Sequence, residues 1–231
     1  MKTLLLCEML CEPFDEGAKK TAFLMVKEFS KNKDFLAITR DGNDNNEVKI
    51  KQITFNKLFL STKLLKAIKN HNPEVIYYLP EASITFLSLV RAKVLGLFSR
   101  HAGVILLAVQ PRKYPWYFLP LVKLPRPRLA LVFSAQHEEY LKNLNFKVKR
   151  IPLGVDTSKF KPGSKTEKDS LRDKYRISKN KFVIMHVGHL KSSRNIESLL
   201  NLQTDKNIQL LIVGSTSTEQ ESGLKDKFVS A

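Results

Sequence analysis

The protein has 231 residues, of which 43% are hydrophobic and 26% are charged, with 9 Gly and 10 Pro. A chain of this length forms one or two globular domains, and this composition excludes collagen, mucin and wholesale disorder. The 39 Lys and Arg residues outnumber the 22 Asp and Glu residues, which gives a net charge of +17. Such a charge predicts an anionic partner: the phosphates of a nucleotide, a nucleic acid or an anionic bilayer.

The amino-terminal segment carries the only two cysteines, Cys7 and Cys11. They are too few for a disulfide framework or a structural zinc site, so we expect idle thiols in a reducing compartment. The apolar stretch before Glu8 is too short for a signal peptide. No apolar run reaches the ~18–20 residues that cross a bilayer, so the sequence predicts a cytoplasmic protein.

Strand and helix patterns alternate along residues 1–150. Short apolar runs predict strands at Leu4–Cys7, Phe35–Thr39, Val48–Phe55, Val75–Leu79, Gly103–Val109 and Leu129–Ser134. Apolar residues at helical spacing predict helices that begin after Asp15–Gly17 and that include Leu60–Ile68, Ile84–Leu97 and Glu138–Leu144. The alternation indicates a doubly wound α/β domain with a parallel sheet covered on both faces. Such folds bind ligands beyond the carboxyl ends of their strands.

The composition changes after this first domain. Residues 151–181 are rich in polar residues, Gly and Pro and read as an interdomain linker with one polar helix near Glu167–Tyr175. Residues 182–231 then offer strands at Phe182–Val187 and Ile208–Val213, with Ser193 as the N-cap of the helix between them. One βαβ unit leaves a sheet incomplete, so we expect the chain to be the front part of a longer protein.

The segment Ile151–Pro162 reads I-P-L-G-V-D-T-S-K-F-K-P. It resembles the interdomain signature of GT-B glycosyltransferases, and most closely that of glycosyltransferase family 4. The segments Gly188–Asn195 and Leu211–Gly214 resemble the loop and the second strand that follow in that family. The resemblance implies a GT-B-like α/β fold. Its parts are an N-terminal Rossmann-like doubly wound sheet on the acceptor side and the first βαβ part of a second Rossmann-like, donor-binding domain.

The chemistry that this resemblance implies is transfer of a sugar from a nucleotide-diphosphate-sugar to an acceptor hydroxyl, with retention of configuration. It implies neither a metal site nor a tightly bound cofactor; the nucleotide-sugar is a substrate. Donor-binding positions carried over from the family are Gly17, Gly188, His189, Arg194 and Gly214. Arg194 stands where the family has its phosphate-contacting lysine, and a guanidinium there would stabilise the departing diphosphate as a catalytic group.

The acceptor side is expected at the end of the Gly103–Val109 strand. Gln110 stands where many family members have a histidine, and it can orient a hydroxyl but cannot act as a base. Arg112, Lys113 and Trp116 follow it and could contact an acceptor phosphate or a membrane. No acidic residue lies between Glu81 and Glu138, and the basic residues of that interval are Arg91, Lys93, Arg100, Arg112, Lys113, Lys123, Arg126 and Arg128.

Bases interleaved with aromatic residues favour a peripheral position on an anionic membrane and a carbohydrate or lipid-linked acceptor. Two alternatives remain open. One is a catalytically inactive, truncated GT-B relative that acts as a binding or scaffold protein. The other is a nucleic-acid binder, which ranks lowest because the sequence has no zinc-finger spacing, no RNP-type aromatic motif and no basic helix leading into heptads. His101 and His137 are expected to be structural or exposed.

Overall fold

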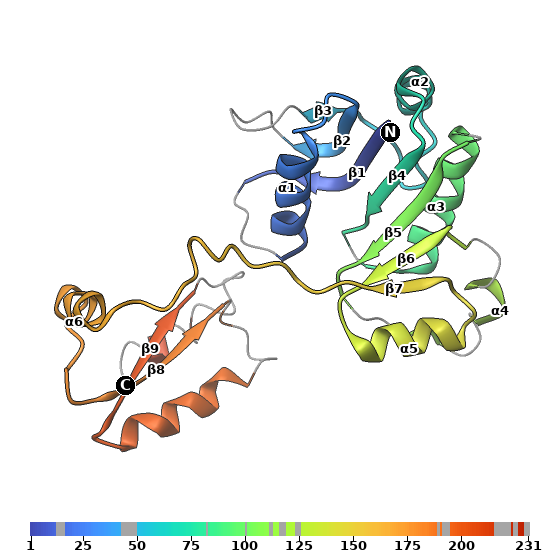
Figure 1. The fold of residues 1–231 in the computed structure, drawn as a ribbon. Coiled ribbons are helices and arrows are strands. Elements are labelled where there is room, and N and C mark those ends of the chain that lie inside the picture. Colours follow the sequence, from blue (N-terminus) through green and yellow to red (C-terminus); the bar gives the residue numbers. More distant parts are fainter. Residues whose placement is uncertain are drawn as a thin grey trace. The chain divides into compact units, whose positions relative to one another are not determined.

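A computed structural model describes residues 1–12, 17–42, 50–81, 83–99, 101–110, 113–115, 119–122, 126–188, 190, 195–214, 223 and 226–228. The chain divides into two units, Met1–Gly154 and Val155–Ala231. Each unit contains its own sheet, a seven-stranded one in the first and a two-stranded one in the second (Figure 1).

The first unit is built on a sheet of seven strands in the order β3-β2-β1-β4-β5-β6-β7. All six strand pairs are parallel. The strands are β1 (Thr3–Leu10), β2 (Phe35–Gly42), β3 (Ile50–Gln52), β4 (Val75–Leu79), β5 (Gly103–Ala108), β6 (Leu129–Val132) and β7 (Val148–Arg150). The order reverses between β1 and β4, as in a doubly wound Rossmann-like sheet, so the predicted fold class is confirmed.

Helices connect these strands: α1 (Gly17–Phe29), α2 (Thr62–His71), α3 (Phe86–Phe98), α4 (Leu119–Val122) and α5 (Ala135–Asn143). Local sequence fixes several of their starts. Ser61 and Ser134 each accept a hydrogen bond from a backbone N–H of the first turn, and Thr85 forms a reciprocal capping box with Ser88. The expectation that α5 begins at Glu138 was wrong by one turn, because Ser134 ends the extended segment and caps the helix.

The two faces of the sheet pack into two separate cores. One core contains Leu4, Leu6, Ile76, Tyr78 and Leu106 together with residues of α2, α3 and α5. The other contains Leu5, Cys7 and Ala37 together with Ala22 and Val26 of α1. Successive strand residues point to opposite faces, so a near-continuous apolar strand such as β1 contributes to both cores.

Burial also determines the chemistry of the two cysteines. Cys7 is 1% exposed, whereas Cys11 is partly exposed. Burial raises the pKa of the Cys7 thiol to about 12. The reactive form of cysteine is the thiolate, so Cys7 is unreactive near neutral pH.

We therefore expect Ellman's reagent at about pH 8 to modify Cys11 quickly in the native protein and both thiols in guanidinium. A Cys11→Ser variant serves as the control, because it should show no fast reaction until it is unfolded. Equal rates for both thiols in the native chain would contradict the burial of Cys7.

The second unit contains α6 (Lys165–Lys174) and the parallel strands β8 (Phe182–Val187) and β9 (Ile208–Val213), which a 3-10 helix, η3 (Ile196–Thr204), connects. Leu190 and Ile196 form its small core, against which Leu199, Ile212 and Phe228 pack. The residue before η3 is Asn195, which has φ 51° and makes no capping hydrogen bond through its side chain. Ser193, predicted as the N-cap, lies outside the described residues and is not the residue that precedes the helix.

Two short elements of the first unit were not predicted, namely α4 and the edge strand β7. Both are too short for a periodic signal: α4 has four residues and β7 has three. Strand β1, by contrast, extends beyond its predicted end at Cys7 and includes Glu8. None of the described helices is long and apolar enough to cross a membrane.

Candidate functional site

The carboxyl ends of β1 and β4 meet where the strand order reverses, which is where doubly wound folds bind ligands. A small cavity of about 10 Å³ lies there, lined by Glu8, Met9, Ala18, Lys19, Leu79 and Glu81. That volume holds about one water molecule. The described residues at this point are therefore packed closely against the first turn of α1.

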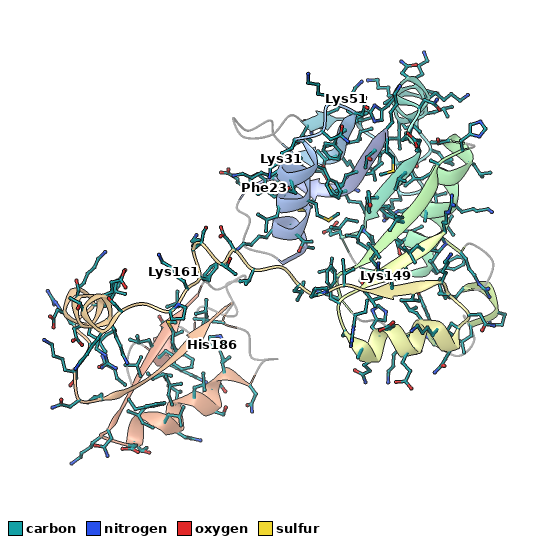
Figure 2. All side chains as sticks on the ribbon, in the orientation of Figure 1. Phe23, Lys31, Lys51, Lys149, Lys161 and His186 are labelled. Carbon is teal, nitrogen blue, oxygen red and sulfur yellow. The ribbon has the colours of Figure 1, made fainter. Side chains whose placement is uncertain are left out.

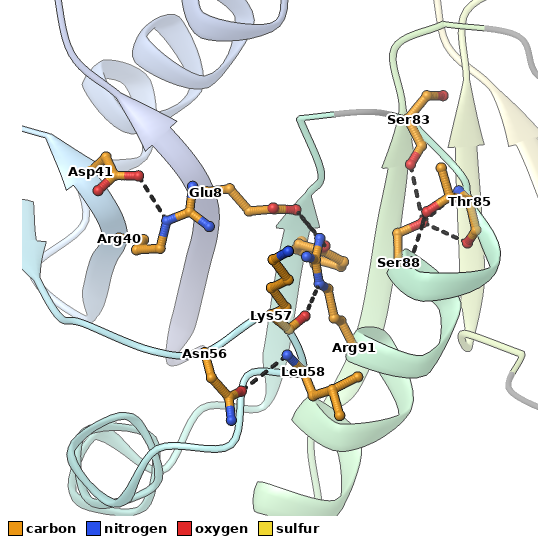
Figure 3. A network of polar contacts seen from close by, with 11 residues as sticks. Glu8, Arg40, Asp41, Asn56, Lys57, Leu58, Ser83, Thr85, Ser88 and Arg91 are labelled. Carbon is orange, nitrogen blue, oxygen red and sulfur yellow. Dashed lines mark hydrogen bonds and ion pairs between the residues drawn. The ribbon is translucent and has the colours of Figure 1, made fainter.

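Beside this point, three polar side chains form a buried cluster (Figure 3). The Tyr78 hydroxyl donates a hydrogen bond of 2.8 Å to Oε1 of Glu8, and the Arg91 guanidinium donates one of 2.7 Å to the same oxygen. Relative exposures are 4% for Glu8, 0% for Tyr78 and 8% for Arg91. Burial, followed by the charge of Glu8, raises the pKa of Tyr78 well above its usual value, so its hydroxyl stays protonated.

Arg91 is held from two further sides. Its Nε donates a 2.6 Å hydrogen bond to the carbonyl oxygen of Lys57, and its guanidinium lies 5.1 Å from the ring centroid of Phe59. The cluster therefore joins β1, β4, α3 and the segment before α2 (Figure 3). The sequence interpretation of Arg91 as part of a basic outer surface was wrong. A lone Arg in an apolar helix and a lone Glu in an apolar strand are the signal that could have paired them.

The segments that follow β4 and β5 are joined to each other. The Ser83 hydroxyl donates to the carbonyl oxygen of Gln110, and the Tyr114 hydroxyl donates a 2.9 Å hydrogen bond to that of Ile84. Gln110 itself is exposed, as is Lys113. The structure thus places two predicted acceptor-side residues beyond the carboxyl end of β5. Arg112 and Trp116 lie outside the described residues.

Helix α5 lies beside these segments. The backbone N–H of Tyr114 donates a 2.7 Å hydrogen bond to the hydroxyl oxygen of Tyr140, and the two rings stack with centroids 6.3 Å apart. One turn earlier, His137 is only 3% exposed, and its Nε2 has no hydrogen-bond partner within the described part of the chain. The sequence predicted that His137 is either structural or exposed, and the structure excludes an exposed side chain.

Burial lowers the pKa of His137, so the folded protein binds its proton less tightly than the unfolded chain does. This group therefore stabilises the fold fully above its unfolded pKa of about 6.5, and that stability is lost as the pH falls through the lower folded value. We expect the stability of His137→Gln to change less between about pH 7.5 and pH 5 than that of the parent chain. Urea unfolding at both pH values measures this, with the exposed His101→Gln as control. Identical pH slopes for all three proteins would rule out the effect.

In the second unit, β8 and β9 end at two glycines in contact. The Gly188 N–H donates a 2.9 Å hydrogen bond to the carbonyl oxygen of Val213. A Cβ atom on Gly214 would lie 1.9 Å from the carbonyl oxygen of Gly188, so no side chain fits there. Gly188 has φ 150°, a conformation that favours glycine. The structure thus brings together two of the predicted donor-binding residues.

The remaining donor-binding predictions are placed only in part. Gly17 is the exposed first residue of α1, and no atom lies within 4 Å of the position that its Cβ would take. Packing alone therefore does not require glycine there. His189 and Arg194 lie outside the described residues. His186, which sequence reasoning passed over, is labelled on β8 in Figure 2, and its buried Nε2 has no hydrogen-bond partner among the described residues.

The described residues include no group of three or more His, Cys, Asp or Glu side chains that could hold a metal ion. Beyond the carboxyl ends of β5, β8 and β9, the described residues offer groups that can form hydrogen bonds. These are the backbone groups of Gly188 and Gly214, the Gln110 amide and the Lys113 ammonium. Such groups bind phosphates and hydroxyls.

No protein-family model matches the sequence, and no curated protein is significantly similar to it. Solved structures do match. A glycosyltransferase from Rickettsia africae ESF-5 has a TM-score of 0.61 at 15% identity, over 93% of this chain and 68% of that one. The N-terminal domain of trehalose-6-phosphate phosphatase from Candida albicans has a TM-score of 0.61 at 12% identity, over 100% of this chain and 68% of that one.

Staphylococcus aureus MnaA, solved with UDP, matches at a TM-score of 0.57 and 13% identity, over 100% of this chain and 66% of that one. The chain has the GT-B-like fold of glycosyltransferases. The predicted GT-B-like α/β fold with a Rossmann-like parallel sheet is therefore confirmed. Identities this low establish the fold alone, because one fold can serve more than one chemistry.

Proposed function

We propose that this protein is a glycosyltransferase of the family 4 type, which transfers a sugar from a nucleotide-diphosphate-sugar to an acceptor hydroxyl with retention. The observation that carries the proposal is the contact between Gly188 and Gly214 at the carboxyl ends of β8 and β9. A strand end without side chains lets a diphosphate approach the backbone closely. The signature at Ile151–Pro162 supports the same assignment, as does the UDP bound to the S. aureus relative.

On the donor side, the departing diphosphate gains negative charge, which the protein must stabilise. Arg194 immediately precedes Asn195 and η3, so its guanidinium and the first N–H groups of that nine-residue helix would share the charge. His189, directly after Gly188, would gain affinity for its proton when the diphosphate binds. This arrangement needs neither a bound metal nor another cofactor.

On the acceptor side, the side-chain amide of the exposed Gln110 would orient the acceptor hydroxyl. The main chain at this position is held in place, because the Ser83 hydroxyl donates a hydrogen bond to the main-chain carbonyl oxygen of Gln110. Lys113 and the neighbouring Arg112 and Trp116 would receive a phosphate of a lipid-linked acceptor at an anionic membrane surface. Flotation with vesicles tests the membrane part. Binding that does not increase when anionic lipid is added would count against it.

The experiment that tests the reaction combines nucleotide-sugar binding with turnover for the 231-residue chain and for the whole open reading frame that contains it. Arg194→Ala should lower kcat about 10²–10³-fold, the usual effect of removing one preorganised donor. The matched control is Arg176→Ala, since Arg176 is an exposed arginine of the same unit. If neither form binds or turns over any nucleotide-sugar, the catalytically inactive alternative holds instead.

A further inference from the structure

A depression of about 310 Å³ lies at the amino-terminal ends of β5 and β6, beside the end of α3. In Figure 1 the arrows of β5 and β6 point away from this end of the sheet. The basic residues that line the depression are Lys93 on α3, His101 before β5, and Arg126 and Arg128 before β6. We call this hollow with its four basic residues the basic depression.

The charges of the basic depression have no described counter-charge. All four basic side chains are exposed, and none of them forms an ion pair with a described residue. The described lining residues include no carboxylate. They all come from the interval between Glu81 and Glu138, in which the sequence has no acidic residue. An anion from solution can therefore approach these cations without displacing an internal partner.

Two nearby features oppose an anion, but they carry less charge than the cations. The carboxyl end of α3 has a partial charge of about −0.5. Glu74 lines an adjoining depression that also includes His101 and Arg128. The Glu74 carboxylate is already engaged, because its Oε1 accepts a 3.0 Å hydrogen bond from the backbone N–H of Lys2 and lies 4.0 Å from the terminal amine. The permanent charges of the lysine and the two arginines outweigh both features.

Packing holds the two arginines in place. A Cβ atom on Gly103 would lie 2.7 Å from Cδ and 3.2 Å from Nη1 of Arg128, so this side chain extends directly over the glycine. The backbone N–H of Arg128 donates a 3.0 Å hydrogen bond to the carbonyl oxygen of Val104. The guanidinium of Arg126 lies 5.9 Å from the ring centroid of Phe146. Guanidinium groups that are held in this way lose less freedom on binding, and each can donate two parallel hydrogen bonds to a phosphate.

The size of the basic depression favours a small ligand. Small-molecule sites span roughly 300–1,000 Å³, and about 310 Å³ is at the lower end of that range. Cations around one hollow suit a terminal phosphate, which has a charge of about −1.5 to −2 and three acceptor oxygens. A nucleic-acid strand presents its phosphates along a line and is bound by a stripe of cations instead.

The basic depression is distant from the expected acceptor side. Gly103, which lines the depression, begins β5, whereas Gln110 lies beyond the carboxyl end of that strand. An extended chain between these two positions spans on the order of 20 Å. A small ligand in the depression therefore does not reach Gln110.

We propose that the basic depression binds a small phosphate monoester. Its terminal phosphate accepts hydrogen bonds from Arg126 and Arg128, and Lys93 and His101 neutralise the remaining charge. The monoester is a soluble compound or the headgroup of a lipid such as phosphatidic acid, because both present the same phosphate group. This binding is separate from sugar transfer and does not rest on it.

The first test is calorimetric titration of the full chain with glycerol 3-phosphate, which should bind saturably. The variant K93Q/R126Q/R128Q should bind at least tenfold more weakly. The matched control is K165Q/K168Q/K174Q on α6, which makes the same change in net charge at exposed positions and should keep the parent affinity. Equal affinities for these two variants would overturn the proposal, because net charge alone would then explain binding.

Gly103→Ala tests the geometry at constant charge. The added Cβ displaces the side chain of Arg128 and meets no backbone atom, so binding should weaken at least threefold while the circular dichroism stays that of the parent. Parent affinity in Gly103→Ala would overturn the proposal. Arg194→Ala should bind glycerol 3-phosphate as the parent does. A loss there would assign the binding to the proposed donor site instead.

The source of the phosphate is decided by flotation with phosphatidylcholine vesicles that contain phosphatidic acid or phosphatidylserine. Binding to phosphatidic acid alone, lost in K93Q/R126Q/R128Q, supports the lipid source, and binding of glycerol 3-phosphate supports the soluble one. Equal binding to both vesicles, or binding of an oligonucleotide but of no monoester, would overturn the proposal. So would loss of binding in the protein of the whole open reading frame, because the rest of the chain would then fill the depression.

Discussion

Replacing Arg91 by Leu should lower the free energy of unfolding by about 3–5 kcal/mol, the usual cost of leaving one member of a buried ion pair alone. The reason is Glu8, whose side chain is 5% exposed and would lose the 2.7 Å contact that balances its charge. The Tyr78 hydroxyl would remain as its only described hydrogen-bond donor. Urea unfolding followed by circular dichroism measures the loss.

Two comparisons make this prediction specific. Arg150→Leu removes an exposed arginine that lies 3.7 Å from Glu138, and it should cost at most about 1 kcal/mol. The double variant Glu8→Gln/Arg91→Leu removes both charges and should recover part of the stability. A loss for Arg91→Leu no larger than that for Arg150→Leu would mean that the buried pair does not stabilise the fold.

The second large effect is expected for Gly214→Ala. The added Cβ would meet the Gly188 carbonyl oxygen at 1.9 Å, a backbone atom that cannot move aside as a flexible side chain can. Overpacking of this kind costs at least about 1–3 kcal/mol. Strands β8 and β9 should separate at this end, with faster amide hydrogen exchange in both and loss of nucleotide-sugar binding.

Gly17→Ala is the matched control, because the position of its Cβ is free of atoms within 4 Å. Alanine there should leave the stability unchanged or raise it by up to about 1 kcal/mol. If the donor diphosphate approaches the backbone closely at Gly17 as well, Gly17→Ala will lower the affinity for the donor without lowering the stability of the fold. Normal exchange rates in β8 and β9 of Gly214→Ala would refute the contact between the two glycines.

Much of the architecture follows from local patterns. The strands Val75–Leu79, Phe182–Val187 and Ile208–Val213 have the predicted bounds, since each is an apolar run ended by Pro or Gly or by a polar turn. The alternation of strands and helices correctly predicted a parallel sheet. Ser193 and the start of α5 were misplaced, because several nearby polar residues can cap a helix and only backbone geometry selects one.

The candidate sites were predictable to a smaller extent. Gly188 and Gly214 were chosen from a motif, and the structure adds that their backbones touch. Gln110 was expected beyond the end of its strand and lies there, but its hydrogen bond from Ser83 joins residues 27 positions apart. Glu8 and Arg91 each stand out as a lone charge in an apolar segment, but they are 83 positions apart, and no local pattern shows that they pair.

By itself, the sequence determined the fold class, the order of the longer elements and the glycines that end β8 and β9, because hydrophobic periodicity and turn chemistry act over a few neighbouring residues. The tertiary structure alone decided which charges are buried and which strand residues the helices cover. Both depend on contacts between distant segments: Arg91 is neutralised only because α3 brings it to Glu8 of β1, and Leu107 of β5 is buried in the same core as Ala22 and Val26 of α1.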